Sequence, residues 1–484
     1  MAKWLKATDE VLSRLEKEYI AKKKKTEEFY FQEVGDSVYY ISAVSGNDEN
    51  DGRSPMSAWK SCAKLTSAEL TQGDAVLFEC GSVFREQIEI VSGVTYSSYG
   101  NGEKPIFYGS IDASDKNAWE QIDKDVYRYK NHIDMYNDIG NVVFDGGAAW
   151  GIKIQKCDDC DMSLALKDVT NGQKFFDRIE SVPLESGEQL PQVDLAYFHS
   201  KDGYIYVCSK NGNPAERFSS VELSQSIKIF NNYKYVENVS FSNLRFACVG
   251  CFAIRMGGCK NITVRNCSFE FIGGAIQFNY ECPWRNYRTR YGNAIENWGS
   301  CIGMTVENCY FNQIYDAGIT TQTNDATARM ENLYYSENVF DCNQYSFELW
   351  GGGVESHFEN VTVKENICKN TGGGFTTQRP DKGHESFFNS KGRHQIKNGT
   401  VTDNVSIGSV GCMMRSNRLC SKEYSEGYFF DRNVYLHEVG KCFALISKEY
   451  PQFSGDIAPV DYCEETVKLL ENTLFEENGT FYYL

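Results

Sequence analysis

A short pattern of apolar and polar positions returns along the second half of the chain. Each copy holds an Asn or Gly, a run rich in alternating β-branched or aromatic residues, a second Asn and an apolar close. The copies begin at Asn238, Asn261, Gly303, Asn332, Asn360 and Asn398. Short apolar segments follow the copies, and these read AIRM, AIQF, AIEN, GITT, SFELW, GGFTT and MMRS. The period-two alternation is typical of strands, and the spacing of three and four that marks a helix is missing.

Strands that repeat without intervening helices predict a solenoid of β-coils, with a unit of about two dozen residues plus insertions. We therefore expect an all-β protein built as a parallel β-helix. One set of Asn residues recurs near a single place in the unit, and their amides should stack and hydrogen-bond along the axis. The set is Asn266, Asn308, Asn338, Asn366 and Asn404. An antiparallel β-sandwich is the alternative, but its strands carry no repeat of fixed phase.

The repeats, together with an N-terminal segment, resemble right-handed parallel β-helix proteins of the pectate-lyase-like superfamily. That segment contains YYISAVSGNDENDGRSPMSAWKSCAKL, GDAVLFECGSVFREQI and YSSYGNGEKPI. The superfamily includes polysaccharide lyases, uronate epimerases and glycoside hydrolases, and the chain is most similar to the hydrolases. The resemblance covers most of the chain and implies a carbohydrate-active protein. The reaction has to be argued from the site, because fold alone does not fix function.

The pattern divides the chain into five parts. A solenoid needs its open end covered, because a bare terminal coil exposes an unpaired strand edge. We expect residues 1–31 to form a helical cap on the end of the β-helix, 32–110 its first coils, 111–235 a β-rich insertion, 236–420 the main β-helix with the active face, and 421–484 the last coils and a closing cap. Aromatic strands joined by NG, DG and GG turns indicate the hairpins of the insertion.

Charge and cysteine usage narrow the partners and the compartment. The net charge is −17, with 49 basic and 66 acidic residues and no basic stripe, which argues against nucleic acid. The N-terminal segment has charges throughout and no apolar core, so we expect neither a secretory signal nor a membrane span. The 18 Cys residues then indicate reduced thiols in a bacterial cytoplasm. We expect a monomer or small homo-oligomer.

Two CxxC pairs raise the question of a metal. The pairs are Cys157 with Cys160 and Cys248 with Cys251, and each is half of a zinc motif. Cys248 also fits a buried position in a strand, where free Cys acts as a small hydrophobe. We expect no metal and no cofactor.

Strand alternation indicates which side chains leave the core. Residues aligned as inward are Ile254, Ile276, Ile295, Ile319, Phe347, Phe375 and Met413. Their outward neighbours are Arg255, Gln277, Glu296, Thr320, Glu348, Thr376 and Met414, and two residues further lie Asn279, Trp298, Gln322, Trp350 and Gln378. Asp316 has the same parity in its coil. Whether Gln277 has a coil of its own is open, because a loop separates AIQF from AIEN.

This face suits a sugar. Trp rings stack on pyranose faces, amides and carboxylates bind hydroxyls, and paired acids supply a proton and either a nucleophile or a base. We expect Asp316, Glu348 and Glu296 to be catalytic, with Asp316 the first choice. We expect the following residues to bind substrate: Trp298, Trp350, Gln322, Gln378, Gln277, and the loop residues Arg290 and Arg379. Arg290 belongs to the loop NYECPWRNYRTRYGN, and Arg379 begins the loop RPDKGHESFFNSKGRHQIK. We expect these two basic loops to form the sides of a cleft that prefers polar or anionic sugars.

Three functions remain open on the sequence. The first is a glycoside hydrolase that cleaves an oligosaccharide with two carboxylates. The second is a lyase or epimerase acting on uronates, with Lys or Arg as base and carboxylates that hold calcium. The third is a glycan-binding protein without catalysis.

Overall fold

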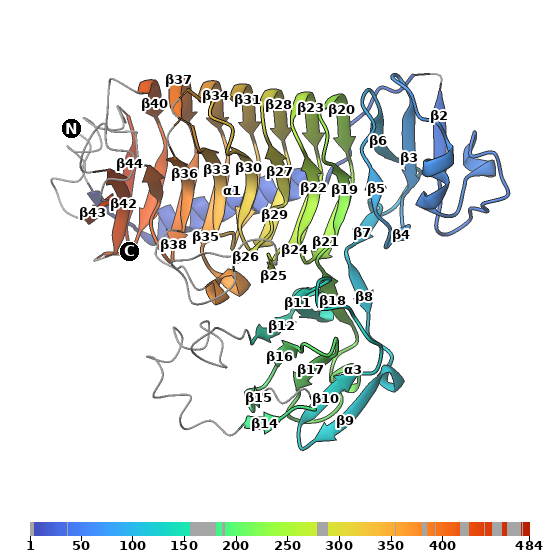
Figure 1. The fold of residues 1–484 in the computed structure, drawn as a ribbon. Helices are drawn as coiled ribbons and strands as arrows, with labels where there is room; N and C mark the ends of the chain where they lie inside the picture. The colour runs from blue at the N-terminus through green and yellow to red at the C-terminus, as the bar shows by residue number, and fades with distance from the viewer. Residues whose placement is uncertain are drawn as a thin grey trace.

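The computed structural model describes residues 4–35, 37–154, 181–185, 189–277, 289–353, 355–379, 385–392, 394–416, 425–439, 441–447, 457–461, 476 and 478–484. Most of this chain winds into coils, and each full coil contributes one strand to each of three long sheets (Figure 1). Neighbouring strands pair in parallel, as β27 with β30 and β30 with β33. At the C-terminal end of one sheet, β43 pairs antiparallel with β42. The predicted all-β parallel β-helix is confirmed.

Sheet A contains, in spatial order, β1 (Trp4–Lys6), β44 (Thr480–Tyr483), β41 (Val434–His437), β38 (Val405–Ser409), β35 (Ile367–Thr371), β32 (Val339–Asp341), β29 (Tyr310–Ile314), β24 (Ser268–Ile272), β21 (Arg245–Val249), β7 (Ile106–Tyr108) and β4 (Val83–Phe84). Sheet B contains β2 (Val38–Ile41), β3 (Ala75–Glu79), β6 (Thr95–Tyr99), β20 (Val236–Ser242), β23 (Cys259–Arg265), β28 (Cys301–Glu307), β31 (Arg329–Ser336), β34 (His357–Lys364), β37 (Gln395–Thr402) and β40 (Ser425–Asp431). Sheet C contains β43 (Ile457–Asp461), β42 (Cys442–Ser447), β39 (Met414–Ser416), β36 (Ser386–Gly392), β33 (Tyr345–Gly351), β30 (Ala317–Thr323), β27 (Ile295–Trp298), β22 (Phe252–Met256), β19 (Lys228–Asn232) and β5 (Ile88–Glu89).

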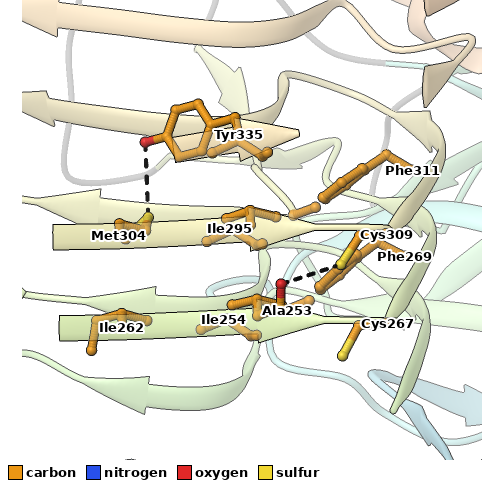
Figure 2. Packing of buried hydrophobic residues seen from close by; sticks show 14 of the residues in the cluster. Ala253, Ile254, Ile262, Cys267, Phe269, Ile295, Met304, Cys309, Phe311 and Tyr335 are labelled. Carbon is orange, nitrogen blue, oxygen red and sulfur yellow. Dashed lines mark hydrogen bonds between the residues drawn. The ribbon is translucent and has the colours of Figure 1, made fainter. Parts of the chain in front are cut away.

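The core is a set of rows in which one inward position repeats from coil to coil. In sheet A the rings of Phe246, Phe269, Phe311 and Phe340 stack with successive centroid distances of 5.0, 4.8 and 4.7 Å. Figure 2 shows Phe269 and Phe311 in this stack, beside Ile254 and Ile295 of sheet C. The distances match the spacing of paired strands, about 4.8 Å. Each coil therefore buries its apolar residues only when its neighbours are in register.

Side-chain amides form a buried ladder along one turn, as the repeat predicts. The ladder runs from Asn338 to Asn366, Asn404 and Asn433, with amide hydrogen bonds of 3.1, 2.9 and 3.0 Å. Asn266 and Asn308 depart from the prediction. Their positive φ angles of 49° and 51° place them one residue before the ladder, and their side chains donate to the carbonyls of Glu28 and Lys25. Cys309 holds the ladder position instead, since its N–H donates to Asn338 Oδ1.

The N-terminal helix α1 (Asp9–Glu27) lies along the flank of the β-helix and not across its end, which corrects the expected cap (Figure 1). Thr8 caps it by accepting from the N–H of Val11. Two of its buried side chains, Leu15 and Tyr19, pack on the outer face of sheet A. Their partners there are Tyr310, Val339, Ile367, Val405 and Leu436. Apolar side chains on the outside of sheet A therefore decide where the helix docks. Within the described residues, no helix is long and apolar enough to cross a membrane.

An inserted unit follows β7 and has its own sheets, which are antiparallel except for the parallel pair β13 and β16 (Figure 1). Its strands are β8 (Ser110–Asp112), β9 (Trp119–Asp123), β10 (Val126–Tyr129), β11 (Ile139–Phe144), β12 (Ala149–Trp150), β13 (Ile152–Lys153), β14 (Ser181–Pro183), β15 (Gln189–Pro191), β16 (Ala196–His199), β17 (Ile205–Cys208) and β18 (Val221–Gln225). Short helical turns are η1 (Pro55–Ser57), η2 (Cys62–Ser67), η3 (Lys116–Ala118), η4 (Asp145–Gly147), α3 (Pro214–Arg217) and η6 (Gly374–Gln378). Strand β19 already belongs to sheet C, so the coils resume before residue 235.

The described cysteines carry free thiols. Cys248 and Cys251 are buried, and burial raises the pKa of Cys251 to about 12. At neutral pH, burial therefore keeps the Cys251 thiol neutral when no metal is bound. Cys157 and Cys160 lie outside the described residues.

Candidate active site

Sheet C presents one outward row of polar side chains across successive coils. The row contains Asn231, Arg255, Glu296, Thr320, Glu348, Asn389 and Arg415. Glu296 and Glu348 therefore lie two coils apart with Thr320 between them, as the alternation predicts. Both carboxylates are nearly closed off from solvent, with 5% and 4% of their residue surfaces exposed.

A second outward row lies two residues further along the strands and contains Trp298, Gln322, Trp350 and Lys391. The two indole rings are stacked, with centroids 6.1 Å apart and planes at 30°. Their strands are two coils apart, about 9.6 Å, so the rings lean toward each other across the Gln322 position. The pair makes an aromatic platform beside the acidic row.

Two predicted members of these rows lie elsewhere. β25 (Ala275–Ile276) pairs antiparallel with β26 (Arg290–Tyr291) in a hairpin, so Gln277 has no place in sheet C. The GGFTT segment forms η6, where Gly374 has φ +62° and Phe375 packs outside the coil against Phe271 and Tyr315. The sheet position that we assigned to Phe375 belongs to Phe388 of β36.

The register of β39 also differs from the prediction by one residue. In β39 it is Met414, not Met413, that aligns with Phe388 and the inward row. The outward row therefore continues through Arg415. Asn279 lies outside the described residues. A period-two pattern cannot tell a strand of the sheet from a similar segment in a loop.

A cleft of about 840 Å³ runs over these rows. Its lining includes Glu296 and Asp316, the platform residues Trp298 and Trp350, and Gln322 between them. The walls come from several elements. They include Gln277, Thr289 and Tyr291 of the hairpin, Asn293, Ser226, Lys228, Tyr233, Phe252 and Arg255 of neighbouring coils, Asn324, Lys391, and Tyr136 of the inserted unit.

Glu296 is the carboxyl group in the cleft with the strongest reason to hold a proton. Burial raises its pKa to about 7, with smaller contributions from the charges of Asp316 and Glu348. Asn293 Nδ2 donates to Glu296 Oε2 over 2.8 Å, and Arg255 Nε lies 3.7 Å from Oε1. These contacts oppose the rise and do not cancel it. A carboxyl group with a pKa near neutrality can serve as a general acid.

Glu348 is held in the opposite state. Burial opposes its ionisation, but Lys391 Nζ lies 2.9 Å from Oε1, and hydrogen bonds from Thr320 and Asn389 reach the same carboxylate. The balance lowers the pKa of Glu348 below its usual value. Glu348 therefore stays ionised, and its charge favours the protonated form of Glu296.

Asp316 stands where β30 begins, and two contacts fix it there. Arg379 Nη1 lies 2.7 Å from Asp316 Oδ1, a distance that favours the ionised carboxylate. The N–H of Ala317 donates to Asn293 Oδ1 over 2.8 Å. Because Asn293 also binds Glu296, one amide sets the positions of Asp316 and Glu296 relative to each other.

Several residues that we predicted to bind substrate instead make contacts within the protein. Arg290 is buried, donates to the carbonyl of Gly274 over 2.7 Å and lies over the ring of Tyr315. Gln378 binds the inserted unit through the carbonyl of Gly151 and the N–H of Lys153. These two residues and Arg379 do not appear in the lining of the cleft. Besides Lys391 and His394, the two loops contain six further basic residues: Arg285, Arg288, Lys382, His384, Arg393 and Lys397. Of these six, the structure describes only Lys397, which lies on β37 of sheet B.

Among the described residues, one group of ligand atoms could hold a metal ion. It consists of Glu331, His357 and Glu359 on sheet B, away from the cleft. Arg329 and His357 already bind the Glu331 carboxylate, at 2.6 and 2.9 Å. The group therefore has no evident link to the chemistry of sheet C.

Sequence reasoning missed part of the cleft. Lys228, Tyr233 and Tyr291 come from segments that we had placed in the insertion or in a loop, and Tyr136 comes from the inserted unit itself. Asn293 sits directly before the AIEN segment, where its amide bonds to two coils could not be foreseen. The strand SFFNSKG could have indicated Lys391, had its alternation been weighed against that of GGFTT.

No protein-family model matches the chain. The lacto-N-biosidase of Bifidobacterium longum subsp. longum is 34% identical to it over an alignment of 97 residues, which covers 18% of this chain and 6% of that protein. The chain thus spans a small fraction of that relative's length.

Two solved structures are similar over most of the chain. The GH136 lacto-N-biosidase from Eubacterium ramulus is 12% identical, with a TM-score of 0.37 over 93% of this chain and 68% of that chain. The hyperthermoactive exopolygalacturonase from Thermotoga maritima is 10% identical, with a TM-score of 0.34 over 92% of this chain and 100% of that chain.

Proposed function

We propose that the protein is a glycoside hydrolase that cleaves an oligosaccharide in the cleft of sheet C. The observation that carries the proposal is the pairing of a protonated and an ionised carboxyl group beside an aromatic platform. Glu296, with a pKa of about 7, is the general acid that protonates the departing glycosidic oxygen. Trp298 and Trp350 hold a sugar ring by stacking.

Asp316 is the ionised partner in this proposal. It lines the cleft, whereas Glu348 does not appear in the lining. Asp316 therefore acts on the anomeric carbon or on the attacking water, and the charge of Glu348 adds to the burial that keeps Glu296 protonated. The partial similarity to a lacto-N-biosidase supports a glycosidase.

The test is incubation with a panel of oligosaccharides and aryl glycosides, in parallel with the Glu296→Gln variant. New reducing ends without ultraviolet-absorbing products, lost in the variant, are the expected result. Absorbance from unsaturated uronates would replace the hydrolase with a lyase. Binding without turnover of any glycan would make the protein a glycan-binding one.

A further inference from the structure

One end of the cleft is built differently from the acidic row. Tyr233 presents its ring to solvent there, with 61% of the residue exposed. Arg255 Cζ lies 4.1 Å from the centroid of that ring, and Lys228 Nζ lies 5.7 Å from it. All three residues line the cleft. Two cations thus flank one exposed aromatic ring, within one or two coils of Glu296.

The guanidinium of Arg255 is only partly satisfied. Its Nη1 is buried and has no hydrogen-bond partner among the residues that the structure describes. Its Nε is 3.7 Å from Glu296 Oε1, which is too long for a hydrogen bond. A buried donor of a charged group without a partner is costly, so such groups are normally paired.

Protein carboxylates do not supply the missing partner. Across the described residues, Glu296 is the one carboxylate within ion-pair distance of Arg255, and none is that close to Lys228. When Glu296 holds its proton as an acid, the charge of Arg255 is left without a counter-charge there. Glu89, on β5 beyond Lys228, is exposed and lines the adjoining hollow of about 340 Å³. It would repel an anion that moved further out.

We propose that Lys228 and Arg255 form a subsite for an anionic substituent of the substrate, a carboxylate or a sulfate, with the sugar ring against Tyr233. The fork of Arg255 accepts both groups through paired hydrogen bonds. The subsite proposal refines the proposed function, and it rests on that function because it requires a glycan to enter the cleft. The same residues would place an acidic sugar unit on the side of Glu296 away from the Trp298 and Trp350 platform.

The test compares glycosides that differ at one carbon. The probes are methyl β-galactoside, its 6-sulfate and methyl β-galacturonide, with the corresponding glucosides, titrated at constant ionic strength by calorimetry or ligand-observed NMR. We expect at least one anionic glycoside to bind about tenfold or more tightly than its neutral counterpart. The carboxylate and sulfate arms show which anion is preferred.

Three variants assign the effect. Arg255→Met and Lys228→Met should each remove most of the anion preference, and Arg255→Lys should keep part of it. Lys260→Met is the control, because Lys260 is exposed on sheet B and its loss changes the net charge equally. Thermal unfolding checks that each variant is folded. If Arg255→Met does not fold, Lys228→Met and Arg255→Lys decide.

Equal binding of neutral and anionic glycosides, no binding of any acidic one, or a preference that survives both Met variants would overturn the proposal. The readout is separate from catalysis. If the protein prefers anionic glycosides but turns over no glycan, the anion subsite stands and the proposed hydrolase activity is refuted. If it turns over neutral glycans but shows no preference for anions, the hydrolase activity stands and the subsite is refuted.

Discussion

Glu296 and Glu348 occupy the same position of strands two coils apart, and their pKa values are displaced in opposite directions. Both side chains are buried, so burial alone would raise the pKa of each carboxyl group. Lys391 reverses the effect for Glu348, whereas Arg255 approaches Glu296 less closely, at 3.7 Å against 2.9 Å. The buried pair therefore holds one protonated and one ionised carboxyl group, and the charge of Glu348 adds to the rise in the pKa of Glu296.

Replacement of the acid should abolish catalysis and leave the fold intact. Glu296→Gln keeps the shape of the side chain and its bond from Asn293, and it removes the proton donor. We expect kcat to fall by about 10²–10⁴-fold on a substrate with a poor leaving group. Glu355→Gln, at an exposed position, is the control and should leave kcat unchanged. Equal activity of the two variants would remove Glu296 from the mechanism.

The raised pKa of Glu296 also links stability to pH. The folded protein keeps the proton up to about pH 7, while the unfolded chain releases it near 4.5. Glu296 therefore contributes about 3 kcal/mol to the free energy of unfolding below pH 4.5, and this contribution is lost as the pH rises to 7. Denaturant unfolding at several pH values measures it.

The difference between wild type and Glu296→Gln isolates this group. Glu476 has a similarly raised pKa of about 7, and His437, whose burial lowers its pKa, titrates with the opposite sign. Both are present in each protein and cancel in the difference. A difference that does not vary between pH 4.5 and 7 would contradict the raised pKa.

The ion pair of Glu348 with Lys391 should contribute to the stability of the folded protein. Lys391→Met leaves a buried carboxylate without its cation, so the pKa of Glu348 should rise and the protein should lose about 1–3 kcal/mol of stability. Denaturant unfolding of the variant and the wild type at neutral pH measures this loss. The double variant with Glu348→Gln should regain part of the stability, and a simple additive loss would show that the two side chains are not coupled.

Asp316 can be separated from a structural role through Arg379. If Asp316 is catalytic, Asp316→Asn should lower kcat by about 10²–10⁴-fold while the melting temperature changes little, because Asn still accepts a bond from Arg379. Arg379→Met should mainly lower stability. Parallel losses of stability and activity in both variants would instead identify Asp316 as a turn residue that anchors η6.

The aromatic platform should contribute to binding more than to chemistry. Trp298→Ala should raise KM about tenfold with little change in kcat, because the ring stacks on sugar before and after the bond breaks. Trp298 is 36% exposed, so the fold should tolerate the change. Trp350→Ala should behave alike, and Trp119→Ala, in the core of the inserted unit, is expected to lower stability instead.

The coil architecture could be predicted from local pattern alone. Alternation within each repeat and the recurrence of Asn at one turn describe a coil that pairs with its copies, and the Phe246 to Phe340 stack follows from that pairing. The same alternation brought Glu296, Glu348, Trp298, Gln322 and Trp350 to one face, because a parallel sheet in register keeps a position in its row.

Tertiary structure decided the rest. The GGFTT segment forms η6 and not a strand, because Phe375 packs outside the coil against Phe271 and Tyr315. Strand β36 pairs with β33 in its place. The helix docked along sheet A because the apolar surface that it covers is assembled from five strands distant in sequence. The charge states of Glu296 and Glu348 depend on burial and on Lys391, Arg255 and Asp316, which belong to three different coils. Contacts of that kind leave no periodic signal, because each depends on a single side chain reaching a neighbour that only the folded chain brings near.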